Sequence, residues 1–127
     1  MVVMVGIGWI AVFPAAVCAE GSVRWLDCAV ARVCDGAGSC AADSSRVVFR
    51  MQPVDAEADG GGRYALSYED AAVEMQALSD VGPFFWTAAA ERHTLLASSQ
   101  TEFLWHRLIV DPSPRATIRF LTCTFGQ

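Results

Sequence analysis

Short runs of alternating apolar and polar residues, separated by turn-forming residues, occupy the chain from residue 23 onward. The clearest run is 63–68, in which Tyr64, Leu66 and Tyr68 alternate with smaller or polar side chains. A period of two residues is typical of a strand with one buried and one solvent-facing side. The segment 72–78 has the same period and fits a strand or a short helical turn, of which we favour the strand.

The pattern predicts about eight short strands and little helix. They are expected at residues 23–32, 46–51, 63–68, 72–78, from 84–86 onward, 92–98, 102–110 and 115–123. The second strand is expected to stop at Pro53. Short strands at regular spacing predict an all-β fold: a small up-and-down, lipocalin-like β-barrel of antiparallel strands, with a β-sandwich as the alternative. The barrel is favoured because pairing the last strand with the first removes two free edges.

The segment 102–110 is apolar on both faces. Phe103, Trp105 and Ile109 fall on one face of the predicted strand, and Leu104 and Leu108 fall on the other. Such a strand is either covered on both sides or contributes to a binding surface.

The first 19 residues contain no charged side chain. We interpret this run as a secretory signal, with Val17 and Ala19 as the small residues of a cleavage site between Ala19 and Glu20. An uncleaved membrane anchor and a lipid-modified Cys18 are the alternatives. The prediction is a single domain, residues 20–127, exported to the periplasm or the outside of the cell, with no membrane span after cleavage.

Four cysteines remain after such a cleavage, and an even number in a short exported chain predicts a disulfide framework. Of the three possible pairings we favour Cys34–Cys40, which closes a small loop containing an Asp-Gly turn signal, and Cys28–Cys123. The second bridge would join the first strand to the last. A thiolate metal site is the alternative, although the spacing matches no zinc pattern.

Charge and composition argue against several partners and activities. The formal net charge is −5, and the nine basic residues, all Arg, are dispersed, so we expect neither nucleic acid nor an anionic lipid surface as a partner. The chain has no Lys and no Asn, which indicates a GC-rich bacterial genome. It has no Gly-x-Ser-x-Gly frame and no Gly-rich loop ahead of a helix. We therefore predict a non-enzymatic protein without a cofactor.

Two weak metal-site patterns are present. The acidic turn at 55–62 carries Asp55, Glu57 and Asp59, whose alternate spacing is that of a calcium loop, but Leu66 falls where such a loop needs a bidentate Glu. A solvated hairpin turn is the alternative interpretation.

The two histidines form the other pattern. If the hairpin of strands 92–98 and 102–110 is centred between Ser99 and Gln100, His93 and His106 face each other, with Glu102 farther along the same side. Two imidazoles and a carboxylate suit zinc or copper. A slip of one residue in the register would separate them.

The aromatic side chains are the most suggestive group. They fit a packed core, or some of them line a binding surface for a small apolar ligand or a protein partner. The candidates for that surface are Trp86, Phe84, Phe103 and Trp105.

The arrangement of Cys28, Phe49, Tyr64, Trp86 and Cys123 resembles the plan of small periplasmic β-barrel proteins, among them the membrane-bound and periplasmic C-type lysozyme inhibitors. The similarity covers size, export and end-to-end cysteines, and so implies architecture. The Ser-Gly before a Tyr and the Lys-Gly after a Trp that mark those inhibitors are not in this chain. It also resembles uncharacterised small exported proteins of alphaproteobacteria.

These observations together predict a non-enzymatic binding or interaction protein of the periplasm or the cell exterior, with an unidentified ligand. One alternative is an inhibitor of an envelope hydrolase that acts through an exposed loop at 55–62 or 79–83. Another is a small metal-binding protein or enzyme that uses His93 and His106.

Overall fold

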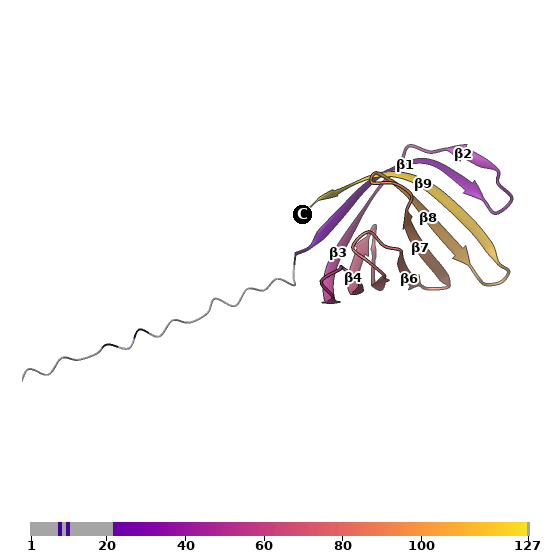
Figure 1. Ribbon diagram of the computed structural model, residues 1–127. Helices are drawn as coiled ribbons and strands as arrows, with labels where there is room; N and C mark the ends of the chain where they lie inside the picture. The colour runs from indigo at the N-terminus through magenta and orange to yellow at the C-terminus, as the bar shows by residue number, and fades with distance from the viewer. Residues whose placement is uncertain (1–7, 9, 11–21, 127) are drawn as a thin grey trace, which may run out of the picture.

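The computed structural model describes residues 22–126, together with Gly8 and Ile10. The described residues form nine strands and no helix (Figure 1). The strands are β1 (Arg24–Asp35), β2 (Cys40–Ala42), β3 (Arg46–Ala56), β4 (Gly62–Tyr68), β5 (Ala71–Ala77), β6 (Phe84–Ala88), β7 (Glu91–Ala97), β8 (Glu102–Ile109) and β9 (Arg115–Gly126). The predicted signal, its cleavage site, the alternative anchor and Cys18 all lie outside the described residues. Within the described part of the chain, no helix is long and apolar enough to span a bilayer.

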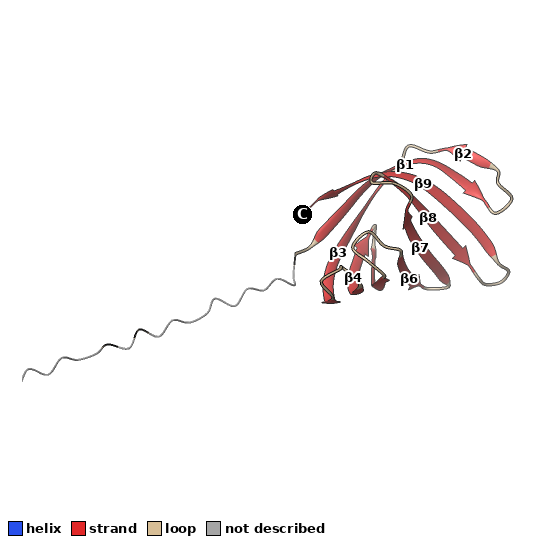
Figure 2. Cartoon of the chain, in the orientation of Figure 1, coloured by secondary structure: helices blue, strands red, loops and turns tan. Residues whose placement is uncertain are grey.

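Eight of the strands close into an antiparallel barrel. The order is β1-β3-β4-β5-β6-β7-β8-β9, and β9 pairs back with β1 along nearly its whole length. β1 and β3 are connected through the short strand β2, and the later barrel strands are joined in chain order by turns and loops (Figure 2). The up-and-down barrel predicted from the sequence is therefore confirmed, and the sandwich alternative is wrong, because a sandwich would leave two separate sheets with free edges.

The additional strand, β2, is a short return of the chain at the far end of β1. It pairs with Arg32–Cys34 of β1. The first half of β1 pairs with β3, so β2 takes the place of β3 beside the second half. The sequence pattern did not predict it, since three residues are too few to show a period. Its first residue is Cys40, so the predicted small Cys34–Cys40 loop is a β-hairpin.

Both predicted disulfides are present. Cys34–Cys40 joins β1 to β2, and Cys28–Cys123 joins β1 to β9. Cys28 and Cys123 lie directly opposite each other in the strand register and are fully buried. Two structural disulfides indicate an oxidising compartment outside the cytoplasm.

β3 is longer than the sequence pattern predicts. It was expected to stop at Pro53, but it continues to Ala56. The pairing of β3 with β1 ends at Met51, so only β4 lies beside the strand beyond that point. Pro53 stands at an irregularity of the β3–β4 register, and bulges and strand edges are the places where a sheet accommodates proline.

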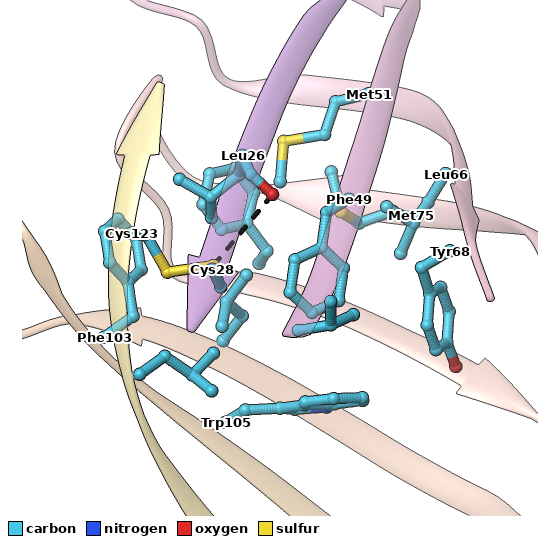
Figure 3. Close-up of a cluster of buried hydrophobic side chains, with 14 of the residues drawn as sticks. Leu26, Cys28, Phe49, Met51, Leu66, Tyr68, Met75, Phe103, Trp105 and Cys123 are labelled. Atoms are coloured by element: carbon cyan, nitrogen blue, oxygen red, sulfur yellow. Dashed lines mark hydrogen bonds between the residues drawn. A yellow bond between two sulfur atoms is a disulfide. The ribbon is translucent and has the colours of Figure 1, made fainter. Parts of the chain in front are cut away.

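The barrel interior is filled with side chains. Leu26, Phe49, Leu66 and Phe103 come from four different strands and are almost completely buried (Figure 3). The ring of Phe49 contacts Trp105 across the barrel, with the ring centroids 5.2 Å apart. Burial of such side chains contributes about 1.5–3 kcal/mol each, so the alternating inner face is the main source of stability.

The two disulfides are expected to contribute unequally to stability. In the chain-entropy model, removing the Cys28–Cys123 bridge, which closes the longer loop, lowers the free energy of unfolding by about 4.7 kcal/mol. Removing the Cys34–Cys40 bridge, which closes the shorter loop, lowers it by about 2.4 kcal/mol. Urea denaturation of the two Cys→Ala double variants measures both values. An equal or larger loss for the Cys34–Cys40 pair would show that barrel closure does not depend on the long bridge.

Candidate functional site

A group of charged and aromatic side chains lies inside one end of the barrel. We call it the charged cluster and define it as Glu91 and His93 of β7, Trp105 and Arg107 of β8, and Arg119 of β9. Each belongs to an inward-facing row, because residues alternate along a strand. On β7 the row continues into the core with Leu95, and on β9 it continues with Leu121.

His93 is the most deeply buried polar residue of the cluster, with 2% of its surface exposed. The indole N–H of Trp105 donates to its Nδ1 at 3.0 Å. An Nδ1 that accepts a hydrogen bond belongs to the neutral tautomer with its proton on Nε2. Trp86 stacks on the imidazole of His93, with the ring centroids 5.0 Å apart and the ring planes 4° from parallel.

Glu91 and Arg107 form the ion pair of the cluster. The Nη2 of Arg107 donates to both carboxylate oxygens, at 2.9 Å and 2.7 Å. This hydrogen bonding lowers the pKa of Glu91, and the positive charge of Arg107 lowers it further, against the opposing effect of burial. Both side chains are 27% exposed, so solvent reaches the cluster from this end of the barrel.

Burial holds the pKa of His93 below its ordinary value of 6.5. The positive charge of Arg107 lowers the pKa further, and the nearby carboxylate of Glu91 opposes both effects without overcoming them. Glu91 Oε2 lies 3.1 Å from His93 Nε2, but the ring N–H is not directed along this line as a hydrogen bond requires. His93 is therefore a neutral imidazole at neutral pH.

Among the described residues, no carboxylate forms an ion pair with Arg119. Arg119 has its Cζ 5.0 Å from the centre of the Trp105 ring. Its Nη1, the Nε of Arg107 and the Nε2 of His93 are buried polar atoms without a hydrogen-bond partner. Buried donors are paired in the large majority of cases, so three unpaired donors in one cluster are an unusual feature.

The two histidines of the predicted metal site are not brought together. The strand register places His106 opposite Thr94 and His93 opposite Arg107, one residue away from the predicted pairing. The shift arises in the turn, where the backbone carbonyl of Glu102 accepts from the backbone N–H groups of Ser98 and Ser99 at 2.8 Å and 3.2 Å. Since side chains alternate between faces, His106 and Glu102 lie on the outside and His93 on the inside.

The predicted calcium loop is not assembled either. Asp59 Oδ1 accepts from the backbone N–H of Gly61 at 2.9 Å, and Asp55 lies 3.8 Å from Arg63. Their carboxylates are thus engaged locally instead of converging with Glu57 on one point. Among the described residues, no group of three or more His, Cys, Asp or Glu side chains is placed to hold a metal ion.

The four aromatic residues proposed as a binding surface belong to the core. Phe84, Trp86, Phe103 and Trp105 are each between 0% and 4% exposed. The inner faces of β6 and β8 carry them, so the surface interpretation is wrong and the packed-core alternative holds. Trp105 nevertheless takes part in the candidate site, as the hydrogen-bond donor to His93.

β8 has two apolar faces, as the sequence predicts. Phe103 and Trp105 face the core, and Leu104 faces outward between Leu96 of β7 and Phe120 of β9, its direct register partners. Arg32 covers part of this outer row, with its Cζ 4.2 Å from the centre of the Phe120 ring. The outer row remains partly exposed to solvent.

The two loops considered as inhibitory elements lie together at the opposite end of the barrel from the charged cluster. The backbone N–H of Asp80 donates to the Asp59 carbonyl at 3.0 Å, and Arg24 donates to the Asp80 carbonyl at 2.6 Å. Gly60 has a φ of +84°, and a side chain there would collide with Asp80. A glycine at this position therefore permits the close approach of the two loops.

Sequence reasoning missed Glu91, Arg107 and Arg119 as members of the site. The available signal was the alternation itself, since Glu91, His93 and Leu95 share one face of β7, and Trp105 and Arg107 share one face of β8. A charged residue in a row that is otherwise apolar indicates a buried or half-buried polar site.

Neither a family model, nor a curated protein, nor a solved structure matches this chain. The similarity to C-type lysozyme inhibitors therefore stays a prediction from the sequence. The function has to be argued from the site alone.

Stability is expected to depend on pH through His93. Its pKa is lower in the folded state than in the unfolded chain, so the unfolded chain binds a proton first as the pH falls below about 6.5. The free energy of unfolding then decreases as the pH falls below about 7, with a slope of at most about 1.4 kcal/mol per pH unit. Thermal denaturation across this range measures the effect.

The variant His93→Gln should lose this pH dependence, and the matched variant His106→Gln should keep it. Glu91 affects stability over a lower pH range. Because its pKa is lowered in the folded state, the stability that it contributes is lost only when the pH falls below about 4.5. An unchanged pH profile in His93→Gln would assign the titration to another group.

Proposed function

We propose that this protein is a non-enzymatic binding protein, exported to the periplasm or the cell exterior through an N-terminal signal, and that its ligand binds at the charged cluster. The observation that carries the proposal is the set of buried, unpaired nitrogen atoms of His93, Arg107 and Arg119. A group of donors left unpaired inside a folded domain costs free energy. A ligand that accepts hydrogen bonds there would recover that cost.

The filled interior favours the end of the barrel over its centre as the binding position. The rings of Phe49, Tyr68, Trp86 and Trp105 contact one another with centroids 5.2 to 6.4 Å apart. An apolar ligand of the kind that lipocalins carry inside their barrels would have to displace these rings. In the charged cluster, in contrast, the side chains of Glu91 and Arg107 are already partly exposed to solvent.

Export is supported by two features. The domain contains two disulfides, which persist in oxidising compartments, and the chain begins with 19 uncharged residues that end in small side chains. A binding protein in that setting meets its ligand in the periplasm or the medium.

Native mass spectrometry of the unreduced protein, recovered from its natural source, tests the proposal. We expect a chain that begins at Glu20 and is lighter by four hydrogens, two for each disulfide, together with the added mass of a bound small molecule. Arg119→Gln should reduce the population with added mass, and Arg92→Gln, which changes an exposed arginine on the outer face of β7, should leave it unchanged.

A bare chain in every preparation would contradict a small molecule that stays bound to the protein in its natural source. A chain that still contains residues 1–19 would contradict cleavage of the signal, whatever is bound. An added mass that persists unchanged in Arg119→Gln would place the ligand elsewhere on the protein.

A second candidate function, inhibition of an envelope hydrolase, is supported by the opposite end of the barrel. The joined loops there present two exposed apolar side chains, Leu78 with 66% and Val81 with 50% of the surface exposed. An apolar side chain on a loop that is held at both sides is suited to enter the substrate cleft of an enzyme.

This second function predicts inhibition of a hydrolase by equimolar protein. With a C-type lysozyme as the probe enzyme, Val81→Asp should weaken inhibition by about tenfold or more, because a charge replaces a buried apolar contact. Val110→Asp is the matched control, since Val110 is 41% exposed and lies beyond β8, at the other end of the barrel. Full lysozyme activity in a large excess of the unaltered protein would contradict this function for that class of enzyme.

A further inference from the structure

We infer that the charged cluster binds a small oxyanion, a carboxylate or phosphate, between the guanidinium groups of Arg107 and Arg119. This inference rests on the binding site proposed above and names the class of its ligand. It follows from four features of the cluster: the register of the two arginines, their unequal pairing, their burial, and the neutral state of the neighbouring histidine.

The strand register brings the two arginines to one place. Arg119 of β9 lies opposite Trp105 of β8, and Arg107 lies opposite Thr117, two residues farther along the same pair of strands. Both guanidinium groups therefore lie against the same indole, with Cζ 5.0 Å and 5.7 Å from the ring centre. Diagonal neighbours on one face of a strand pair are within reach of long side chains.

The carboxylates near this pair do not neutralise it. Glu91 engages Arg107 through Nη2 alone, which leaves the Nε of Arg107 without a partner. Asp35 is aligned with Thr117 on the adjoining strand β1, but its Oδ1 accepts from the backbone N–H groups of Ala37 and Ser39, each at 2.9 Å. The cluster consequently carries a net positive charge inside a protein whose net charge is negative.

Burial makes this positive charge costly in the absence of an anion. Burial lowers the pKa of Arg119, and the positive charge of Arg107 lowers that pKa further, while Glu69, Asp43 and Glu91 oppose both effects without overcoming them. A guanidinium stays protonated in proteins, so the cost appears as repulsion between two half-buried cations. An anion placed between them would remove that repulsion and supply acceptors.

The neighbouring side chains suit an oxyanion and not a cation. His93 is neutral and its proton is on Nε2, so it offers a donor without adding charge. Tyr68 also keeps its proton, because burial raises the pKa of its phenol, and its hydroxyl accepts the Trp86 indole N–H at 3.1 Å. Guanidinium forks match the planar acceptor pairs of carboxylates and phosphates.

The test is a titration of the oxidised protein with two separate probes, acetate and inorganic phosphate, at constant ionic strength set with chloride. Isothermal titration calorimetry gives the affinity, and thermal denaturation gives the accompanying rise in Tm. We expect saturable binding of at least one probe. A preference for acetate identifies a carboxylate ligand, and a preference for phosphate identifies a phosphate ligand.

Arg119→Gln should weaken the binding by about tenfold or more, since it removes a charged donor. Arg119→Lys keeps the positive charge but loses the planar set of paired N–H donors that a guanidinium has, so an intermediate affinity is expected. The matched control Arg92→Gln should bind as the unaltered protein does. Without added anion, the Tm of Arg119→Gln should be unchanged or higher, because the substitution removes an unpaired half-buried charge; a purely structural role for Arg119 would lower it.

The inference is overturned if neither probe binds saturably, or if Arg119→Gln binds both probes as tightly as the unaltered protein. This result differs from a failure of the proposed function. A bare chain in native mass spectrometry with intact anion titration would contradict a resident ligand and leave the site standing. A neutral ligand found by native mass spectrometry, together with no anion binding in the titrations, would support the proposed function and overturn the oxyanion inference.

Discussion

The structure depends on the pairing of β9 with β1. Without it, the remaining strands would form an open sheet with two exposed edges and an apolar face in contact with water. Cys28 and Cys123 lie directly opposite each other in this pairing, so a covalent bond holds the register at which the barrel closes. That register decides which residues of β9 face the interior, since a slip of one residue would turn Arg119 outward and Phe120 inward.

The same pairing also produces the site. The β1–β9 register shifts between Val30 and Arg32, and beyond this bulge β1 is flanked by β2 in place of β3. Figure 1 shows β1, β2, β8 and β9 reaching past the shorter strands on the other side of the barrel. The strand register places Arg119 opposite Val33 of β1 and Arg107 opposite Thr117, so both arginines of the cluster belong to this extension.

The architecture could be predicted from the sequence because it depends on local signals. The two-residue period, the turn residues and the even cysteine count identify strands, connections and bridges wherever they occur, and the barrel with both disulfides followed from them. The site could not be predicted, because it depends on register. Shifting the register of one hairpin by a single residue separated His93 from His106, and placed His93 opposite Arg107. Nothing local in the serine-rich turn distinguishes these two registers until the hydrogen bonds to Glu102 are known.

His93 links the stability of the barrel to the state of the cluster. As a neutral ring it accepts from Trp105, stacks on Trp86 and separates the core from the ion pair. A proton on Nδ1 would break the hydrogen bond to Trp105 and add a third positive charge beside Arg107 and Arg119. An anion held by the two arginines would attract that charge, so a bound anion should raise the pKa of His93. By linkage, protonation of His93 would then strengthen anion binding to the same extent. If an anion binds as we infer, it would be held more tightly as the pH falls, even while the unliganded barrel loses stability.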